Sequence, residues 1–380
     1  MKKSAFVLVI SFAFFLCNVL CAQDFQYSQP FAVPIYLNPA FTGNGIMDCN
    51  NSRKWYKKEN FRFAFQHRNQ WFSGVNGNYN SSLAAFDYSW GRLGRKKTGN
   101  LNWSFGGFVQ NDYLSKARLN SLYAGLTVSV DVPLLDDNKS LKFGYQIAGG
   151  NRSLSKPNFD WGDEFNGSGF NFNSSEENPA VGNSQFYGDI ASVGGLYGTK
   201  NFFVGFSWHH IANPNISMWN GRDRLNEKIS AHGGLILSPK MAKFGKPSRQ
   251  KNRIFIVSSF KQQNGSQQWD FGAYIQHTRK TWNGGNLMLG TWYRGIPFRK
   301  APDNFVQNDA VVSSLGLRVN TLTIFFSYDI PISKAAIFGR SMEISISYQY
   351  TTTGCRTRSG TLKRTIVCPD GGSGLQPWKN

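Results

Sequence analysis

Charged residues are scarce in this sequence, and acidic residues are the scarcer kind. Charged side chains make up 17% of the 380 residues, with 42 Lys and Arg against 22 Asp and Glu, so the formal charge is +20. Only the N-terminus carries an apolar run of membrane-spanning length, and the mean hydropathy is −0.37, which excludes a bundle of transmembrane helices. Apolar residues at 41% and aromatic residues at 15% exclude a disordered chain and, beside 39 glycines, favour an all-β protein.

Histidine and cysteine are too few and too scattered to predict a metal or catalytic site. The five histidines lie on different predicted strands, at His67, His209, His210, His232 and His277. No Cys/His spacing matches a zinc site, so we expect no metal, no cofactor and hydrogen-bonding histidines in the lumen or at an interface. Adjacent strand residues point to opposite faces, which argues against His209 with His210 as a metal pair. We expect no enzyme activity, with a Ser/His/carboxylate site in the wall as the alternative.

The N-terminus has the parts of a secretory signal peptide. A basic start is followed by an apolar stretch over residues 5–16 and by the small residue Ala22, so we expect cleavage before Gln23. One alternative is an uncleaved anchor helix, which polar Asn18 argues against. The other is a lipid-modified cysteine, for which the sequence before Cys21 is a poor match.

Removal of this leader leaves 358 residues with a formal charge of +18 and three cysteines. Export places these cysteines in an oxidising compartment, which permits a disulfide. The candidate pair is Cys355 with Cys368, because this bridge closes a local loop near the C-terminus and leaves Cys49 unpaired. Structural free thiols are the alternative.

Most of the remaining chain alternates apolar residues with small or polar ones, which is the period of a β-strand with two different faces. In residues 141–148, for example, Leu141, Phe143, Tyr145 and Ile147 alternate with Lys, Gly, Gln and Ala. Fourteen such segments recur along the chain. They begin near Phe61, Leu83, Leu101, Leu122, Leu141, Phe186, Phe202, Ile229, Ile254, Trp269, Leu287, Val311, Leu322 and Met342.

A transmembrane antiparallel β-barrel of about 14 strands explains these segments better than a soluble sandwich. A barrel turns the apolar face to lipid and the polar face to the lumen, and bacterial outer-membrane barrels have an even number of strands. We expect tryptophans to form interfacial girdles, at Trp71, Trp90, Trp103, Trp208, Trp269 and Trp292. On this parity Arg62, Arg68, Asp131 and Glu343 point inward, because a charge facing lipid costs about 2–4 kcal/mol near the membrane centre.

Loop lengths predict the orientation. Long connections follow odd-numbered strands, at 151–185, 210–227, 295–309 and 331–341. Tight connections follow even-numbered strands, at 199–201 and 319–321, whereas the long connection 238–253 breaks the rule. Because outer-membrane barrels have short periplasmic turns, we expect both termini in the periplasm. The predicted division is a signal peptide (1–22), a periplasmic or plug-like segment (23–60), the barrel (61–350) and a periplasmic tail (351–380).

The stretch from residue 23 to residue 44 is rich in proline and aromatic residues and does not alternate. Proline is excluded from central strands, so this stretch is not part of the barrel wall. Its apolar side chains need cover, and we predict that Tyr36, Leu37 and Phe41 are largely buried, in the lumen or against a partner. A disordered leader is the alternative.

Several short motifs occur in order over the chain. They are QDFQYSQ (23–29), YLNPAFTG (36–43), RNQW (68–71), WYRGIPF (292–298), NDA (308–310), SYD (327–329), EISISY (343–348) and CP (368–369). In these motifs the chain resembles the PorP/SprF family of Bacteroidota. The resemblance implies a non-enzymatic outer-membrane barrel of the type IX secretion system, in some members of gliding motility. It also implies a role in export or surface attachment of cargo adhesins.

We therefore expect partners among secretion and motility proteins, a secreted adhesin and outer-membrane lipids, but no nucleic acid. The first alternative is a diffusion channel, because fourteen strands enclose a lumen wide enough for solutes unless it is plugged. The second is a barrel hydrolase. Connection 238–253 holds six basic residues and no acid, which suits either lipid phosphates or an acidic partner, and we predict a partner. The candidate partner-binding residues are Lys240, Lys243, Lys246, Arg249, Lys251, Arg253, Tyr36 and Phe41.

Overall fold

The fold is known from a computed structural model. It describes residues 24–43, 60–72, 78–92, 101–134, 139–155, 165–166, 169–170, 184–199, 201–218, 221–237, 250–279, 285–300, 306–319, 321–333 and 339–351. Within these residues no helix has both the length and the apolar character needed to cross a membrane.

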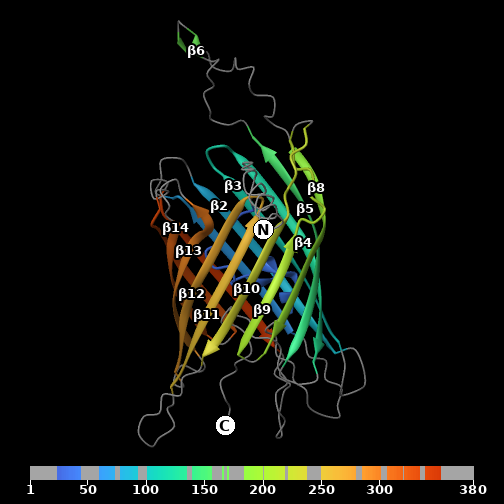
Figure 1. Ribbon diagram of the computed structural model, residues 1–380, viewed down its shortest axis with the longest axis vertical. Coiled ribbons are helices and arrows are strands. Elements are labelled where there is room, and N and C mark those ends of the chain that lie inside the picture. Colours follow the sequence, from blue (N-terminus) through green and yellow to red (C-terminus); the bar gives the residue numbers. More distant parts are fainter. Residues whose placement is uncertain are drawn as a thin grey trace, which may run out of the picture.

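Fourteen antiparallel strands close into one barrel, which confirms the predicted architecture and strand number (Figure 1). Strands that neighbour each other in the ring pair in sequence order, and β1 closes the ring by pairing with β16. The strands are β1 (Asn60–Gln70), β2 (Tyr79–Arg92), β3 (Asn102–Leu114), β4 (Leu119–Pro133), β5 (Ser140–Leu154), β8 (Ser184–Gly198), β9 (Phe202–His209), β10 (Lys228–Leu237), β11 (Gln250–Gln263), β12 (Ser266–Arg279), β13 (Asn286–Lys300), β14 (Val306–Val319), β15 (Leu322–Pro331) and β16 (Ser341–Thr351).

The two ends of the barrel differ, and we name them the rim and the base. The base is the end at which β1 starts at Asn60 and β16 ends at Thr351, at the bottom of Figure 1. The rim is the opposite end. Beyond the rim, the two-residue strands β6 (Phe165–Asn166) and β7 (Gly169–Phe170) pair with each other (Figure 1).

The connections follow the predicted alternation only in part. The tight connection between β8 and β9 lies at the base, and the long connections between β5 and β8 and between β9 and β10 lie at the rim. Against the alternation, the tight turn between β11 and β12 lies at the rim, and the long connection between β10 and β11 lies at the base. The expected loop 295–309 shrinks to 301–305, because β13 continues to Lys300. The expected loop 238–253 shrinks to 238–249, because β11 begins at Gln250 and includes the last two basic residues. Alternation of side chains marks a strand but does not show how far it extends beyond its apolar centre.

The outward and inward faces of the wall carry different residues. Large apolar side chains face outward and are exposed, among them Phe186 at 73%, Ile190 at 65% and Leu126 at 60%. A continuous exposed band of this kind suits lipid rather than water. The four charged residues that the parity places inward are buried, namely Arg62, Arg68, Asp131 and Glu343.

One tryptophan contradicts the girdle prediction. Trp103 and Trp269 are exposed on the outer face, but Trp292 is only 6% exposed and packs inside the barrel beside Tyr274 and Met288. Trp292 is two residues from Arg294 on the same strand, so both side chains point inward. The place of Trp292 in the alternation, and not its residue type, decides its position. The inward face therefore has an apolar region as well as a polar one.

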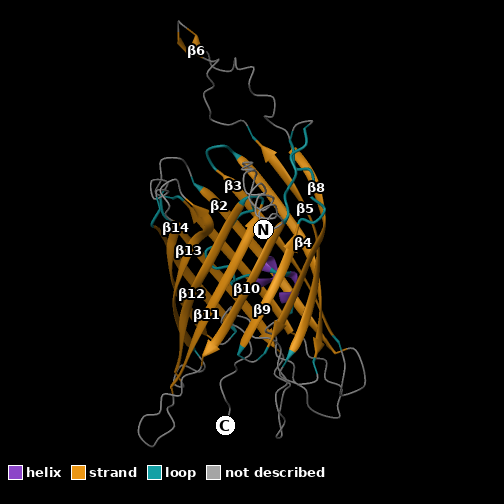
Figure 2. Cartoon of the chain, in the orientation of Figure 1, coloured by secondary structure: helices purple, strands orange, loops and turns teal. Residues whose placement is uncertain are grey.

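Residues 24–43 lie in the lumen and run from the rim toward the base. Asp24 contacts His210 and Lys228, which stand at the rim ends of β9 and β10. At the other end, the Gly43 backbone N–H donates to Asp87 at 2.6 Å, near the base. Figure 2 shows the two short helices of this segment inside the ring of strands. Asp24 therefore lies at the opposite barrel end from Asn60.

Candidate functional site

The inner part of the N-terminal segment is built from two short helices, α2 (Pro34–Leu37) and η1 (Pro39–Phe41). Each begins with proline, whose fixed φ suits a first helical position and whose missing N–H needs no partner there. Between them, the Asn38 side chain accepts a 2.8 Å hydrogen bond from the backbone N–H two residues later. Its amide nitrogen donates to the carbonyls of Gly195 and Phe206, each at 3.1 Å, so one residue both caps a helix and ties it to β8 and β9.

Two glycines in the wall make room for these helices. Gly144 of β5 and Gly194 of β8 are direct partners in the sheet. A Cβ at Gly144 would lie 2.3 Å from the backbone nitrogen of Ala40, and one at Gly194 would lie 1.9 Å from Asn38 Oδ1. Only glycine therefore permits this close approach of the helix backbone to the barrel wall.

Apolar side chains of the segment cover the apolar part of the lumen wall in two clusters. In the first, Phe41 is fully buried between Phe203 and His232. In the second, Ile35 is 1% exposed and packs with Leu83. A fully buried side chain of this size contributes about 1.5–3 kcal/mol, so the segment is a packed part of the fold.

A buried carboxylate holds the extended part of the segment. Glu343 of β16 accepts hydrogen bonds from the backbone N–H groups of Ser28 and Gln29, at 2.6 and 2.9 Å. It also accepts from Gln66 Nε2 at 2.6 Å. The carboxylate thus supplies acceptors to backbone donors that have no strand partner, which burial would otherwise make costly.

Next to Glu343, buried ion pairs link four strands of the wall, β1, β12, β13 and β15. Asp329 accepts from Arg68 at 2.9 Å, from Arg294 at 3.0 Å and from the Ser28 hydroxyl at 2.7 Å. Arg294 also contacts Asp270 at 3.0 Å. Charges buried in this way are retained only when each is paired, so the lumen is polar here but electrically balanced.

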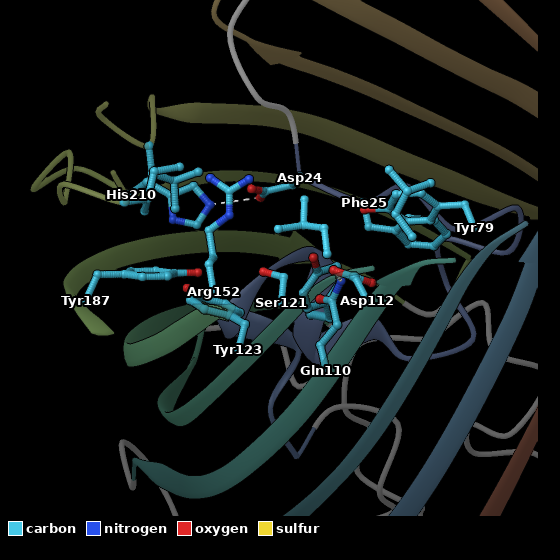
Figure 3. A pocket seen from close by; sticks show the side chains of 15 residues that line it. Asp24, Phe25, Tyr79, Gln110, Asp112, Ser121, Tyr123, Arg152, Tyr187 and His210 are labelled. Atoms are coloured by element: carbon cyan, nitrogen blue, oxygen red, sulfur yellow. Dashed lines mark hydrogen bonds and ion pairs between the residues drawn. The ribbon is translucent and has the colours of Figure 1, made fainter. Parts of the chain in front are cut away.

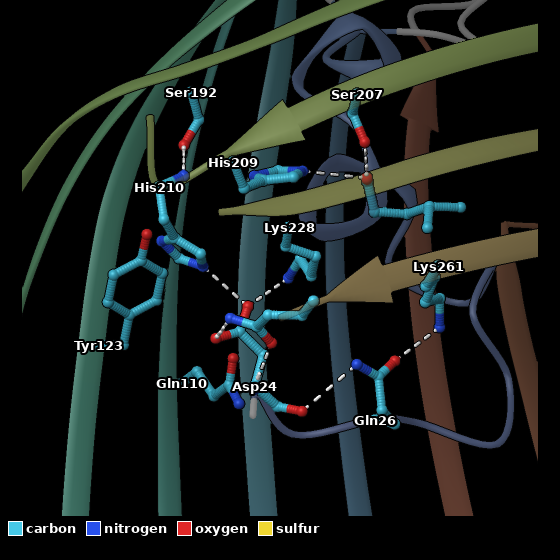
Figure 4. Close-up of polar contacts among 12 residues, drawn as sticks. Asp24, Gln26, Gln110, Tyr123, Ser192, Ser207, His209, His210, Lys228 and Lys261 are labelled. Carbon is cyan, nitrogen blue, oxygen red and sulfur yellow. Dashed lines mark hydrogen bonds and ion pairs between the residues drawn. The ribbon is translucent and has the colours of Figure 1, made fainter. Parts of the chain in front are cut away.

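At the rim, Asp24 latches the segment to the wall (Figure 4). Its carboxylate contacts His210 Nε2 at 2.8 Å and also binds the Lys228 ammonium. The other ring nitrogen of His210 contacts Asp189 at 2.7 Å. A second link runs through Gln263, which accepts from the Asp24 backbone N–H at 2.7 Å. We call Asp24, His210, Lys228 and Asp189 the rim latch.

The charges of the rim latch stabilise one another. Burial by itself lowers the pKa of His210, but the carboxylates of Asp24 and Asp189 outweigh it and raise the pKa to about 9. Burial by itself raises the pKa of Asp24, but His210 and Lys228 outweigh it and hold the pKa well below its usual value. At neutral pH the histidine is therefore a cation and Asp24 an anion.

The two adjacent histidines both point into the lumen, which corrects the expectation of opposite faces. His209 is the last residue of β9, and its ring contacts the Leu37 carbonyl at 3.2 Å. His210 has a φ of +59°, so the chain leaves the strand geometry there and turns the second ring inward as well. The hydrogen-bonding role expected for histidines is confirmed for both. Among the described residues, no group of His, Cys, Asp or Glu could hold a metal ion.

Two cavities open near the rim latch, and Asp24 lines the first of them. The first, of about 90 Å³, lies between the segment and strands β2 to β5 and β8 (Figure 3). Its lining includes Asp112, Tyr79 and Tyr187. The second, of about 270 Å³, lies on the side of β10 to β14 and is lined by Lys261 and Arg294 among other polar residues. We call the first one the rim cavity.

The structure describes only some of the predicted partner-binding residues. Phe41 is fully buried and Tyr36 is half-buried, both inside the barrel. Lys251 lies in β11, and Arg253 of the same strand is half-buried with an interaction partner. The remaining predicted residues lie outside the described residues, namely Lys240, Lys243, Lys246, Arg249, Cys355 and Cys368.

The residues that hold segment 24–43 to the barrel wall were not identified from the sequence. Asp24 and Asn38 lie in the motifs QDFQYSQ and YLNPAFTG, which were noted as motifs without a role for either residue. Lys228 gave a weaker signal, as a charge at an inward position at the start of a strand. Their partners are about 160 to 200 positions away, for example 204 for Lys228 with Asp24 and 157 for Asn38 with Gly195. No local pattern reports such contacts.

Comparison with solved structures returns other barrels. BamA from Haemophilus ducreyi lacking POTRA domains 1–3 is similar at 8% identity and a TM-score of 0.41, over 82% of this chain and 76% of that chain. CdiB from Acinetobacter baumannii is similar at 10% identity and a TM-score of 0.41, over 78% and 61%. The outer membrane protein Omp33 from the same organism is similar at 8% identity and a TM-score of 0.36, over 77% and 99%. No curated protein matches the chain.

A family comparison gives the more specific result. The family described as type IX secretion system membrane protein PorP/SprF matches residues 19–348. This range covers the lumen segment and all but the last three residues of the final strand. The family match is therefore continuous over the residues that form the barrel and over those that fill its lumen. The chain is a member of the PorP/SprF family of type IX secretion system membrane proteins.

Proposed function

We propose that the protein is a non-enzymatic outer-membrane component that supports export or surface anchoring of cargo adhesins by binding protein partners. The family membership supports a place in the type IX secretion machinery. The observation that carries the proposal is the occupied lumen, because residues 24–43 are packed between opposite walls of the barrel. With the lumen filled, the rim and the base are the surfaces left for partners.

The occupied lumen speaks against the alternative of a diffusion channel. In single-channel recordings of the purified protein in planar bilayers, we expect no steady open state. A deletion of residues 24–43 should open the barrel, because the lumen of fourteen strands is wide enough for solutes. A large, steady conductance of the intact protein would support the channel instead.

The secretion role is tested by deleting the gene in its native host and measuring surface display of large adhesins. We expect one or a few adhesins to be lost from the surface, with normal outer-membrane content otherwise. Re-expression of the intact chain should restore them. Normal display of every type IX substrate in the deletion strain would contradict the role.

We further propose that the rim faces outside, so that the base and the tail 351–380 face the periplasm with Cys355 and Cys368 as a candidate disulfide. The support is that the two longest connections, between β5 and β8 and between β9 and β10, lie at the rim. In this orientation the basic connection 238–249 and the tail form an electrostatic docking face for an acidic periplasmic partner. Exposed charges of this kind set the association rate and the choice of partner, and their effect weakens with salt.

The docking face is tested by charge reversal. Changing Lys240, Lys243, Lys246 and Arg249 to Glu should leave the barrel folded and reduce co-purification of periplasmic partners. The matched control reverses four exposed cations at the rim, Lys116, Arg118, Arg222 and Arg224. We expect the control to leave recovery of periplasmic partners unchanged. Equal recovery with both variants would assign the basic connection to lipid contact.

A further inference from the structure

The rim cavity has aromatic walls on two sides. Phe25 stacks on Tyr79 at a centroid distance of 5.2 Å, and Tyr123 stacks on Tyr187 at 6.4 Å. Figure 3 shows the two pairs on opposite sides, with Asp112 placed between them. Aromatic faces carry negative charge in their π-systems, so a cavity between such faces favours a cation over an anion.

The floor of the rim cavity has an acceptor without a donor. Gln110 is 2% exposed, and its amide nitrogen donates to Asp112 Oδ2 at 2.8 Å. The Ser81 hydroxyl is the second side-chain partner of Asp112. Within the part of the chain that the structure describes, Gln110 Oε1 is buried and accepts no hydrogen bond. Buried acceptors without partners are costly, so this site is suited to a group that brings N–H donors.

The charges around the rim cavity leave one carboxylate uncompensated. Within the rim latch, two carboxylates face one imidazolium and one ammonium, so that set is balanced. Arg152, which also lines the cavity, forms a 3.9 Å pair with Asp223. Asp112 has no ion pair with any described residue. The carboxylate of Asp112 is therefore the one charge at the cavity that no described cation balances.

We propose that the rim cavity binds a primary ammonium group on an alkyl chain, presented by a lysine side chain of a protein partner. This inference rests on the proposed function, in which the protein binds protein partners. The ammonium would donate to Asp112 and Gln110, and the aromatic pairs would flank its alkyl chain. A cavity of about 90 Å³ has room for the end of a side chain.

The test uses the full-length protein in phosphatidylcholine nanodiscs, whose lipid headgroups carry no primary amine. N-acetyl-lysine amide and its uncharged analogue N-acetyl-norleucine amide are titrated and followed by ligand-observed NMR. We expect the lysine probe to bind roughly tenfold more tightly than the norleucine probe, because a charge-assisted hydrogen bond is lost with the ammonium. Equal binding of the two probes, or no binding of either, would overturn the proposal.

Variants separate the cavity from general charge effects. Asp112→Asn should weaken lysine-probe binding about tenfold, whereas Glu227→Gln, which removes a rim carboxylate that does not line the cavity, should not. Tyr79→Leu removes an aromatic wall without a charge change and should weaken binding about threefold. Barrel integrity is checked by circular dichroism. If both cavity variants fold and bind as the wild type does, the proposal is wrong.

The outcome is independent of the secretion experiment. A negative titration would remove the lysine site and leave the partner-binding role in place, because the probe is a small molecule. Normal adhesin display in the deletion strain would remove the secretion role and leave the measured binding intact.

Discussion

The two ends of the lumen segment are held by different forces. At the rim, Asp24 is held by a histidinium and an ammonium, and a cavity lies beside it. At the inner end, Asn38 and Phe41 are held by neutral hydrogen bonds, by packing and by the room that two wall glycines leave. Charged side chains add only hydrogen bonds to the backbone there, from Gly43 to Asp87 and from Lys142 to Thr42. The rim end therefore responds most to charge and pH, and the inner end responds most to shape.

This difference indicates which end opens first. Close packing tolerates little change in volume, so the inner end is released only by a large rearrangement. Ion pairs beside water-accessible cavities are weakened by screening and by protonation changes. We expect disturbance of the segment to begin at Asp24 and to reach the inner end last.

The largest effect is expected from closing the space at the inner end. In Gly144→Ala the new Cβ meets only backbone atoms of Pro39 and Ala40, at 2.3–2.5 Å, so the helix must move as a unit. Overpacking of this kind costs about 3 kcal/mol or more. In a background with the native cysteines changed to Ser, a Thr42→Cys, Thr127→Cys pair reports seating by disulfide formation, since the two hydroxyls are 2.8 Å apart.

The control is Gly195→Ala, one residue along β8 from the sheet partner of Gly144. A Cβ there meets nothing within 4 Å. We expect cross-linking to fall in Gly144→Ala and to stay at the parent level in Gly195→Ala. Equal cross-linking in both variants would show that the inner end is not held by shape.

A smaller effect is expected at the rim. Asp24→Asn removes the partner of Lys228 and one partner of His210, at a cost of about 1.5–3 kcal/mol for charge-assisted hydrogen bonds. A cysteine at Gln26 should then react faster with a maleimide, while the Thr42–Thr127 cross-link persists. Asp223→Asn, an exposed rim carboxylate, is the charge-matched control. Loss of the inner cross-link in Asp24→Asn would show that the two ends are released together.

The smallest effect is expected from pH. The pKa of His210 is raised from 6.5 to about 9, so its stabilising contribution is complete below pH 6.5 and is lost between pH 6.5 and 9. The slope is at most about 1.4 kcal/mol per pH unit. The groups facing His210 are Asp24, Asp189, Lys228 and the Tyr123 and His209 rings.

Thermal unfolding of the wild type and of His210→Gln at pH 6 and pH 9 measures this contribution. We expect the wild-type advantage to shrink as the pH rises. Asp24, whose pKa is depressed, contributes in the opposite sense, because its stabilisation is present above pH 3.8 and is lost as the pH falls further. An advantage that grows between pH 6 and 9 would contradict the assigned charge of His210.

Period-two alternation predicted the barrel closely because it is a local property. Each of the fourteen predicted segments corresponds to one strand of the ring, and the charged residues placed inward by parity are buried there. Membrane insertion enforces this parity, since a charge on the lipid face is costly at every strand. The proline-rich stretch was likewise predicted to stand outside the wall, because proline cannot supply a ladder hydrogen bond.

Two assignments failed where the partner of the side chain is not lipid. Trp292 was assigned to a girdle by its type, but it packs in the lumen, where the segment provides cover. His209 and His210 were expected on opposite faces, but the positive φ of His210 turns its side chain inward as well. Both errors come from contacts that only the closed barrel creates.

The sequence by itself therefore determined the alternating strands, their number and the family, because these depend on neighbouring residues and on the solvent each face meets. Only the tertiary structure decided how the lumen is filled. Asp24 meets Lys228 across 204 residues, and Ser28 meets Glu343 across 315, so their contacts exist only after the ring closes. Barrel closure brings such distant polar groups into a space with little solvent, where burial without a partner is costly, and this cost fixes the position of the segment.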